Sequence, residues 1–220
     1  MITRYAGLDP SLNAFGYSVI EVDENHQLKG VHFDTIKTKE RNIFKSFSIV
    51  NSLKQLKILD GVHFVGIEHY NFGGVSNSLY ELGELGGIIR YFCAENGVNL
   101  VEIPPAILKS FATNNGQAPK EVVLARTKRF LTERGIDMIP RTDDEADAFW
   151  TAYFAMCFDR IDDKLPIQRF QWDNLFKAKS KWEELCLQSE SHPPIKFYLV
   201  QQSQQRRRKA RSSRCGKLKM

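Results

Sequence analysis

"YAGLDPSLNAFGYSVIEV", residues 5–22, is the stretch that decides how the fold begins. Two apolar segments that read as strands, 3–10 and 15–22, enclose the short loop "PSLNA", which is rich in turn-forming residues, so we expect a β-hairpin. Asp9 stands at the end of the first segment. An ionised carboxylate beside a buried strand costs several kcal/mol unless it has a partner. Asp9 therefore either caps the turn or holds a cation.

Beyond the hairpin, strand-like and helix-like patterns alternate. A third strand is expected over 29–38, and two further strands are expected over 62–70 and 97–105. Apolar residues at helical spacing predict four helices, at 42–61, 76–95, 119–135 and 142–158. The first three strands are joined by short connections, which predicts an antiparallel meander. The whole order predicts an α/β fold, a mixed five-stranded sheet flanked by helices.

Composition places the chain among ordinary soluble proteins, with 42% hydrophobic and 26% charged residues. The longest apolar run, 148–158, is too short to span a bilayer, and no signal-peptide pattern is visible. The four cysteines are widely spaced, which argues against a zinc site or a disulfide scaffold and for a reducing compartment. We therefore expect a cytoplasmic protein with no membrane partner.

The net charge of +5 comes from the end of the chain. Residues 206–219 contain eight Lys or Arg, and without them 23 basic residues face 26 acidic ones. A basic run of this kind is typical of a disordered arm that binds nucleic acid, although a merely solubilising tail is the alternative. The DNA-binding candidates in it are Arg206, Arg207, Arg208 and Lys209.

Acidic residues from three distant places could converge. Asp9 ends the first strand, Glu68 ends the fourth, and Asp143, Asp144 and Asp147 start the last predicted helix, where residues three or four apart share a face. Converging carboxylates repel one another unless divalent cations neutralise them. Oxygen ligands without Cys or His select Mg²⁺ or Mn²⁺, and a pair of such ions about 4 Å apart serves phosphodiester cleavage. Taken singly, capping is the commoner role of these acids.

Over residues 3–158 the chain resembles the RuvC family of Holliday-junction resolvases, which are dimeric endonucleases with an RNase H-like fold. Four segments carry the resemblance, in the family's order: "GLDPSLNAFGYSVIE" (7–21), "GIEHYNFGGVSNSLYELGELGGII" (66–89), "PPAILKSFATNNGQAPKEVV" (104–123) and "DDEADAFWTAYFA" (143–155). Each motif is weak alone, and their order makes the signal strong. Residues 160–220 depart from the bacterial pattern of the family, which suggests a relative from a phage-infected bacterial cell or an organelle.

The resemblance implies a catalytic site with two Mg²⁺ ions, for which Mn²⁺ can substitute. The implied metal ligands are Asp9, Glu68, Asp144 and Asp147, with Asp143 able to replace or assist Asp144. Lys109 and Lys120 are implied to contact the DNA, and Lys120 to stabilise the scissile phosphate as a catalytic residue. Without the resemblance, Lys120 would be read as a solvated surface lysine.

The segment after Glu68 and the helix that follows it are implied to recognise junctions and to form a dimer. In the family an aromatic side chain opens base pairs at the crossover, and Tyr70 or Phe72 can fill that role, although both rings could instead pack in the core. The glycines in "ELGELGGIIR" (81–90) destabilise a helix, which close approach to another element can offset. The resemblance implies a two-fold homodimer here, and packing on the chain's own sheet is the alternative.

We therefore predict a magnesium-dependent crossover junction endodeoxyribonuclease that resolves four-way junctions, and other branched DNA, by paired nicks that leave 5′-phosphates. Residues 1–158 would form the RNase H-like nuclease domain, 159–200 a helical extension and 201–220 a disordered basic tail. Two alternatives stay open. The same carboxylates would serve a nuclease acting on RNA or RNA–DNA hybrids, and a non-catalytic module could bind branched DNA.

Overall fold

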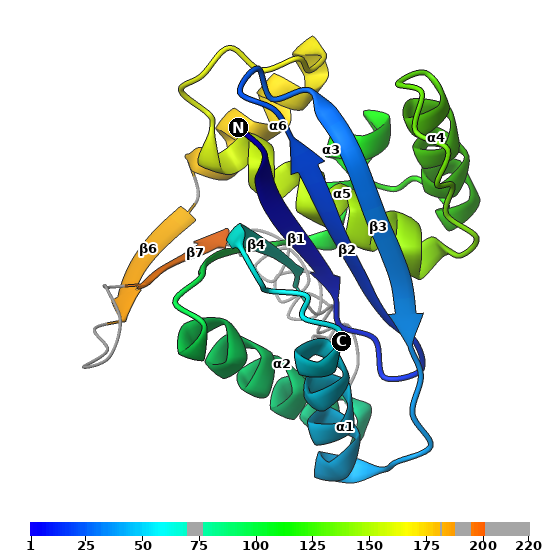
Figure 1. Ribbon diagram of the computed structural model, residues 1–220, viewed down its shortest axis with the longest axis vertical. Coiled ribbons are helices and arrows are strands. Elements are labelled where there is room, and N and C mark those ends of the chain that lie inside the picture. Colours follow the sequence, from blue (N-terminus) through cyan, green and yellow to red (C-terminus); the bar gives the residue numbers. More distant parts are fainter. Residues whose placement is uncertain (70–76, 181, 188–194, 201–220) are drawn as a thin grey trace, which may run out of the picture.

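A single mixed sheet of seven strands, in the order β3-β2-β1-β4-β5-β7-β6, forms the centre of the molecule (Figure 1). The computed structural model describes residues 1–69, 77–180, 182–187 and 195–200. The strands are β1 (Thr3–Asp9), β2 (Phe15–Val22), β3 (Leu28–Ile36), β4 (Val62–Glu68), β5 (Asn99–Ile103), β6 (Trp182–Leu187) and β7 (Ile195–Val200). The first five in sequence make the predicted mixed five-stranded sheet, in the order 3-2-1-4-5.

The N-terminal meander forms as its sequence predicts. β1 pairs antiparallel with β2, and β2 pairs antiparallel with β3. Asp9 lies opposite Gly16, so the loop between them returns the chain directly beside the end of β1. The hairpin therefore holds Asp9 at the C-terminal end of β1, a central strand of the sheet.

The remaining strands beside β1 run parallel to it. β1 pairs with β4, β4 with β5, and β5 with β7, all in parallel. The registers connect Leu8, Ile67, Glu102 and Leu199 into one row across four strands. All four strands consequently end at the same edge of the sheet, called here the carboxyl edge.

Helices cover both faces of the sheet. The helices are α1 (Asn42–Gln55), α2 (Asn77–Glu95), α3 (Pro105–Thr113), α4 (Lys120–Thr132), α5 (Asp143–Asp159) and α6 (Arg169–Lys179). One buried apolar cluster lies between the sheet and α1 and α2, and the other lies between the sheet, α5 and the helices outside it. Figure 1 shows α1 and α2 together on one side, and α3, α4 and α6 around α5 on the other.

α5 is the central helix, and every residue from Glu145 to Phe158 is buried. Its apolar and aromatic side chains explain this, because they have the sheet on one side and α3, α4 and α6 on the other. Phe149, Trp150 and Tyr153 pack against Phe130 of α4, and the Trp150 indole donates a hydrogen bond to Thr127 Oγ1 at 2.8 Å. The helix is thus fixed on all sides.

Three expectations from the sequence need correction. The helix predicted over 42–61 ends at Gln55, and a turn occupies the residues up to Gly61. α3 was not expected, because Pro104 and Pro105 were read only as the end of a strand, whereas proline also suits the first turn of a helix. The extension 159–200 is not purely helical, because α6 is followed by the antiparallel pair β6 and β7, which adds to the open side of β5.

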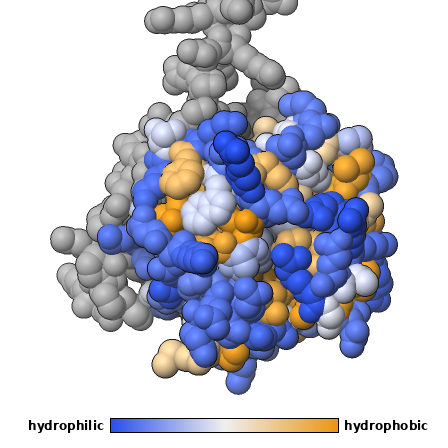
Figure 2. Space-filling model, turned by 90° about the horizontal axis from the view of Figure 1, so that it is seen from above, coloured by the Kyte–Doolittle hydropathy of each residue, from blue (hydrophilic) through white to orange (hydrophobic). Residues whose placement is uncertain are grey.

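No helix among the described residues is long and apolar enough to cross a membrane. On the face that Figure 2 shows, which is the upper end of the view in Figure 1, hydrophilic residues predominate and hydrophobic ones gather in small areas between them.

Candidate active site

Three carboxylates meet at the carboxyl edge of the sheet. Asp9 ends β1, Glu68 ends the neighbouring β4, and Asp147 comes from α5. One oxygen from each lies within 4.8 Å of those of the other two. Asp9 and Glu68 are half-buried and Asp147 is buried. The predicted convergence of acids from three parts of the chain is therefore present, and these three residues are called the acidic triad below.

Side chains alternate between the two faces of a strand, and this alternation directs Asp9 and Glu68 toward α5. Alternate residues of a strand point to one face, so Asp9 shares its face with Gly7, and Glu68 shares its face with Gly66. Gly7 and Gly66 are partners in the β1–β4 register. The α5 backbone lies so close to both that a Cβ on Gly66 would be 2.5 Å from the Thr151 carbonyl oxygen, and a Cβ on Gly7 would overlap Ala148 and Ala152. The paired glycines let α5 bring Asp147 down to the strand ends.

The start of α5 is fixed by a capping box. Thr142 Oγ1 accepts a hydrogen bond from the Glu145 backbone N–H at 3.2 Å, and Glu145 Oε2 accepts one from the Thr142 N–H at 3.3 Å. Such reciprocal caps define where a helix begins. Asp143 and Asp144 follow in the first turn, where the helix dipole favours negative charge.

Burial and mutual repulsion disfavour ionisation of the triad. Burial, followed by the charges of Asp147 and Asp144, raises the pKa of Asp9 well above its usual range. Burial and the charges of Asp9 and Asp147 do the same to the pKa of Glu68. Burial raises the pKa of Asp147 to about 6. The ionised form of the triad is thus disfavoured unless positive charge lies nearby.

Two predicted lysines supply part of the missing positive charge. Lys120, the first residue of α4, donates a hydrogen bond to Asp143 Oδ2, which raises the pKa of Lys120 and lowers that of Asp143. The Lys120 ammonium also lowers the pKa values of Asp9 and Asp147, against the larger effect of burial. Lys109 of α3 acts likewise on Glu68 and Asp147. Both lysines therefore face the triad.

The remaining acids of the cluster lie beside the triad. Neither Asp143 nor Asp144 belongs to the group whose oxygens lie within 4.8 Å of one another among the described residues. Asp143 pairs with Lys120, whereas burial and the charge of Asp143 raise the pKa of Asp144. Gly16 brings β2 close to this turn, since a Cβ there would be 2.5 Å from the Asp144 carbonyl oxygen.

The structure adds two features that the sequence reasoning missed. Lys37, just after β3, lowers the pKa of Asp144, so its ammonium lies near the first turn of α5. The predicted meander could have indicated this, because β3 ends at the same edge as β1. The second feature is Glu102 of β5, which is 1% exposed and accepts a hydrogen bond from Arg90 Nε of α2. A charged residue within a predicted buried strand was the available signal.

Glu102 connects α2 to the chain segment that carries Glu68. Its other oxygen lies 3.9 Å from Nε2 of His69, the residue after Glu68. The His69 backbone N–H also donates to the Ile103 carbonyl at 2.9 Å. These contacts hold the end of β4 against the end of β5.

Several predicted site residues lie outside the described residues. These are Tyr70, Phe72, Arg206, Arg207, Arg208 and Lys209. The predictions for them stay predictions.

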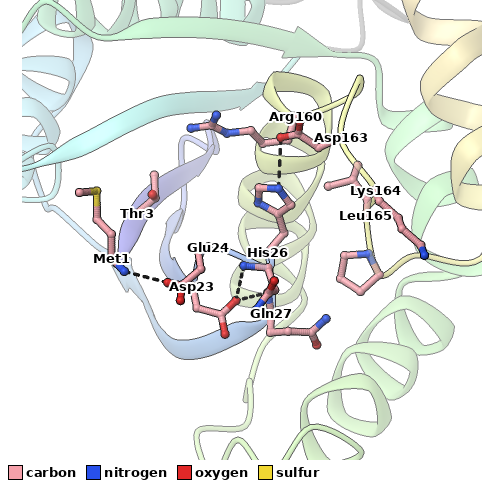
Figure 3. Close-up of a pocket in the computed structure, with 12 residues that line it drawn as sticks. Met1, Thr3, Asp23, Glu24, His26, Gln27, Arg160, Asp163, Lys164 and Leu165 are labelled. Carbon is pink, nitrogen blue, oxygen red and sulfur yellow. Dashed lines mark hydrogen bonds and ion pairs between the residues drawn. The ribbon is translucent and has the colours of Figure 1, made fainter.

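A polar pocket of about 730 Å³ lies at the opposite, amino edge of the sheet (Figure 3). Charged groups around it pair with one another, as in the 2.8 Å contact of the Met1 amino group with Glu24 and the 3.1 Å contact of His26 with Asp163. It shares no residue with the acidic triad. The pocket is therefore separate from the acidic triad.

The donor set of the triad fits a hard divalent cation. All three ligands are carboxylates, and oxygen ligands of this kind suit Mg²⁺ or Mn²⁺. The raised pKa values of the three carboxyl groups show that their ionised forms are disfavoured, and a bound cation would offset the repulsion between them.

Comparison with known proteins gives one consistent result. Residues 5–155 match the family model described as crossover junction endodeoxyribonuclease RuvC. The RuvC of Caldicellulosiruptor saccharolyticus is 28% identical over 152 residues, which cover 68% of this chain and 89% of that protein. The RuvC of Prochlorococcus marinus is 31% identical over 145 residues, covering 64% and 90%.

Solved structures agree on the fold. The structure of Thermus thermophilus RuvC has a TM-score of 0.60 and 24% identity, and the match covers 76% of this chain and all of that one. The complex of Thermus thermophilus RuvC with a Holliday junction substrate has a TM-score of 0.56 and 22% identity, covering 69% and 90%. The mixed sheet and its helices are thus those of the RuvC fold, as the sequence predicted.

Proposed function

Because this chain belongs to the RuvC family of crossover junction endodeoxyribonucleases, we propose that it resolves Holliday junctions by divalent-metal-dependent hydrolysis at the acidic triad. The single observation that carries this is the convergence of Asp9, Glu68 and Asp147 within 4.8 Å at the carboxyl edge. A protein that only binds DNA gains nothing from buried carboxylates next to phosphates, because they repel them.

We infer that the triad, with Asp144, holds two Mg²⁺ ions, for which Mn²⁺ can substitute. Bound there, the ions supply an activated water and stabilise the leaving oxygen in phosphodiester cleavage. The chain's own task is to hold its carboxylates ionised and directed to one point. Asp144 supports this role because its charge raises the pKa values of both Asp9 and Asp147, so it lies near them.

Lys109 and Lys120 are proposed to contact the phosphate that is cut. Lys120 is 60% exposed in its side chain, so it can exchange its contact with Asp143 for one with DNA. A positioned ammonium stabilises charge that develops on phosphate oxygens. Cleavage at the 3′ oxygen would leave 5′-phosphates, which are ends that a ligase can join.

A homodimer through α2 is the proposed assembly. Tyr80 and Tyr91 are 77% and 63% exposed, and a Cβ on Gly83 or Gly87 between them would meet none of the described residues within 4 Å. These two glycines therefore do not serve packing on the described part of the chain's own sheet. Close approach of a second copy fits them, and a two-fold dimer suits paired cuts in a four-way junction.

The test offers the protein three labelled substrates: a synthetic four-way junction, linear duplex of the same sequence, and RNA–DNA hybrid. We expect Mg²⁺-dependent cutting of the junction, with symmetrical nicks and 5′-phosphate ends. Asp9→Asn should bind the junction and fail to cut it, because the metal site loses a charge and a ligand.

The same test separates the two alternatives. Preferential cutting of the hybrid would favour a nuclease for RNA–DNA hybrids. Junction binding without cutting at any concentration of Mg²⁺ or Mn²⁺ would favour a non-catalytic module.

A further inference from the structure

An uncharged loop connects the two lysines that face the acidic triad. Residues 114–118, with the sequence "NNGQA", follow α3, which carries Lys109, and end two residues before Lys120, the first residue of α4. We call these residues the amide loop, because its polar side chains are the amides of Asn114, Asn115 and Gln117. The amide loop therefore lies between the two proposed phosphate contacts.

The amide loop folds back along α3 toward the carboxyl edge of the sheet. β5 ends at this edge with Ile103, and α3 begins two residues later at Pro105. A Cβ on Gly116 would lie 2.8 Å from the carbonyl oxygen of Ala106, which is in the first turn of α3, so glycine allows the loop to pack against that turn. The loop thus lies near the end of β5, the strand that pairs with the one ending in Glu68.

Hydrogen bonds hold the backbone of the amide loop. The Asn114 N–H donates to the Ser110 carbonyl at 2.8 Å, and the φ of Asn114 is 63°, a left-handed conformation that asparagine adopts more readily than most residues. Asn115 Oδ1 accepts a hydrogen bond from the Gln117 N–H at 3.0 Å, and the N–H of the buried Ala118 donates to the Asn115 carbonyl at 3.0 Å. These contacts fix the loop without using the side-chain amides of Asn114 and Gln117.

The side-chain amides of Asn114 and Gln117 are available to a ligand. Both residues are exposed, and neither amide has a hydrogen-bond partner among the residues that the structure describes. Each amide offers donors and an acceptor. Cations supply most of a protein's affinity for phosphates, whereas an amide can pair with the edge of a base, and with adenine it pairs through both N6 and N7. Two neutral amides between two lysines therefore suit contacts with bases.

The amide loop is close enough to reach nucleotides beside the cut. Gln117 precedes Lys120 by three residues, which span at most about 11 Å. Each nucleotide advances a DNA strand by about 3.4 Å along the helix axis. The loop thus reaches nucleotides within about three steps of the phosphate that Lys120 is proposed to contact.

We propose that the side-chain amides of Asn114 and Gln117 contact base edges beside the scissile phosphate and set the sequence preference of cleavage, with adenine as the preferred base. This inference rests on the proposed function and deepens it, because it names the residues that select among the junctions that the triad cuts. Contacts of lysines with phosphates carry no sequence information, so selection needs a second set of contacts.

The test uses a library of four-way junctions with randomised base pairs around the crossover. A limiting amount of protein cuts the library in Mg²⁺, and the cut and uncut strands are sequenced. We expect the wild type to prefer adenine, in the cut strand or its complement, by about fivefold or more at one or two positions near the cut, which is the discrimination that a bidentate contact supplies. Equal cutting of all sequences would overturn the inference.

Asn114→Gly with Gln117→Ala removes both amides and preserves the backbone of the loop, because glycine suits the positive φ at position 114. We expect this double variant to cut all sequences at similar rates and to keep its melting temperature, because both side chains are exposed. Asn25→Gly with Gln27→Ala is the matched control. It removes the same two kinds of amide from the turn between β2 and β3 at the amino edge, where Figure 3 shows Gln27. Retention of the preference in the double variant, or its loss in the control, would contradict the inference.

Gln117→Arg distinguishes a contact with a base from a contact with a phosphate. Arginine pairs bidentately with O6 and N7 of guanine, so the preference at one position should change from adenine to guanine. An equal increase in the cutting of all sequences would mean that position 117 contacts phosphates, and the inference would fail.

Failure of this inference and failure of the proposed function give different results. If the wild type cuts junctions of every sequence equally, the proposed function stands and the inference fails. If it cuts no junction in Mg²⁺ or Mn²⁺, the proposed function fails. The junctions that the protein binds in Ca²⁺ then test the amide contacts, because adenine should be enriched among those bound by the wild type and not among those bound by the double variant.

Discussion

At the scale of single residues, the fold holds the three carboxyl groups of the triad together although burial and mutual repulsion disfavour their ionised forms. Asp147 is 8% exposed, and its carboxyl has a pKa of about 6 in the folded protein, above the usual value of an aspartate. The folded state consequently binds protons that the unfolded chain has already released. Stability from this source is complete below the unfolded pKa and is lost as the pH rises through about 6.

We therefore expect the metal-free protein to lose stability as the pH rises from about 4 to 7, with Asp147 alone contributing about 2–3 kcal/mol. Asp147→Asn should flatten this part of the pH profile and raise the stability of the metal-free protein at pH above about 6. Thermal or urea unfolding in EDTA measures it. Addition of Mn²⁺ should stabilise the wild type at neutral pH and the variant much less. A metal-free stability that increases over this pH range would contradict the assignment.

The neighbouring acids Asp143 and Asp144 are predicted to differ. Asp143 pairs with Lys120, so Asp143→Asn should leave Mn²⁺ affinity nearly unchanged. Asp144 is the proposed ligand, so Asp144→Asn should weaken Mn²⁺ binding at least tenfold, about 1.4 kcal/mol. Isothermal titration with Mn²⁺ at fixed pH compares the two variants, which differ only in position. The reverse order of affinities would make Asp143 the ligand.

At the scale of elements, the close packing of α5 on the sheet decides whether Asp147 reaches the ends of β1 and β4. Gly66→Ala would place a methyl group 2.5 Å from the Thr151 carbonyl oxygen, and neither backbone can move freely. We expect a loss of stability of about 1–3 kcal/mol, the usual cost of overpacking, together with loss of cleavage. Gly30→Ala on β3 is the control, because its methyl group would meet the movable Glu21 carboxylate at 3.1 Å. Equal melting temperatures for the two variants would show that α5 does not depend on Gly66.

The ion pair between Arg90 of α2 and Glu102 of β5 is a second contact between elements that supports the site. Glu102→Gln removes the carboxylate that Arg90 contacts, and the Arg90 side chain is 31% exposed. Loss of one partner of a largely buried pair should cost about 1–3 kcal/mol and, through His69, lower the cleavage rate. The double variant Glu102→Leu with Arg90→Met removes both charges and should recover most of the stability. A double-mutant cycle in urea measures the coupling, and additive losses would mean that the pair is not coupled.

The local patterns were sufficient for much of this arrangement. Alternating residues and a short loop predict the hairpin that carries Asp9, whereas the parallel pairing of β1 with β4 is a finding of the structure. The candidate acids could be recognised because they lie at the ends of strands and in the first turns of a helix, but which three of them meet is given by the structure. The pairing of Asp143 with Lys120 could not be predicted, because it depends on how α4 lies against α5. The addition of β7 to β5 is also a long-range event, which short sequence patterns do not encode.

At the scale of the whole molecule, the exposed face of α2 is the surface through which we propose that a second copy of the chain packs. Phe47, Val50, Ile88 and Tyr91 line a groove of about 430 Å³ between α1 and α2, next to the open glycine positions. A monomer rarely keeps such a face uncovered. In the proposed dimer, each copy would bring one triad to the junction, so that the two opposed strands would be cut together.

Tyr91→Glu is therefore expected to give a folded monomer. The ring is 63% exposed in the single chain, so its loss should change the melting temperature of a monomer little, whereas a charge in an apolar dimer interface costs several kcal/mol. Met138→Glu, at an exposed methionine outside α1 and α2, is the matched control. Sedimentation equilibrium should show a dimer for the wild type and the control, and a monomer for Tyr91→Glu. On a supercoiled plasmid with a cruciform, the monomer should give nicked circles where the dimer gives linear product. A wild-type monomer at micromolar concentration, or linear product from a monomeric variant, would contradict a dimer through α2.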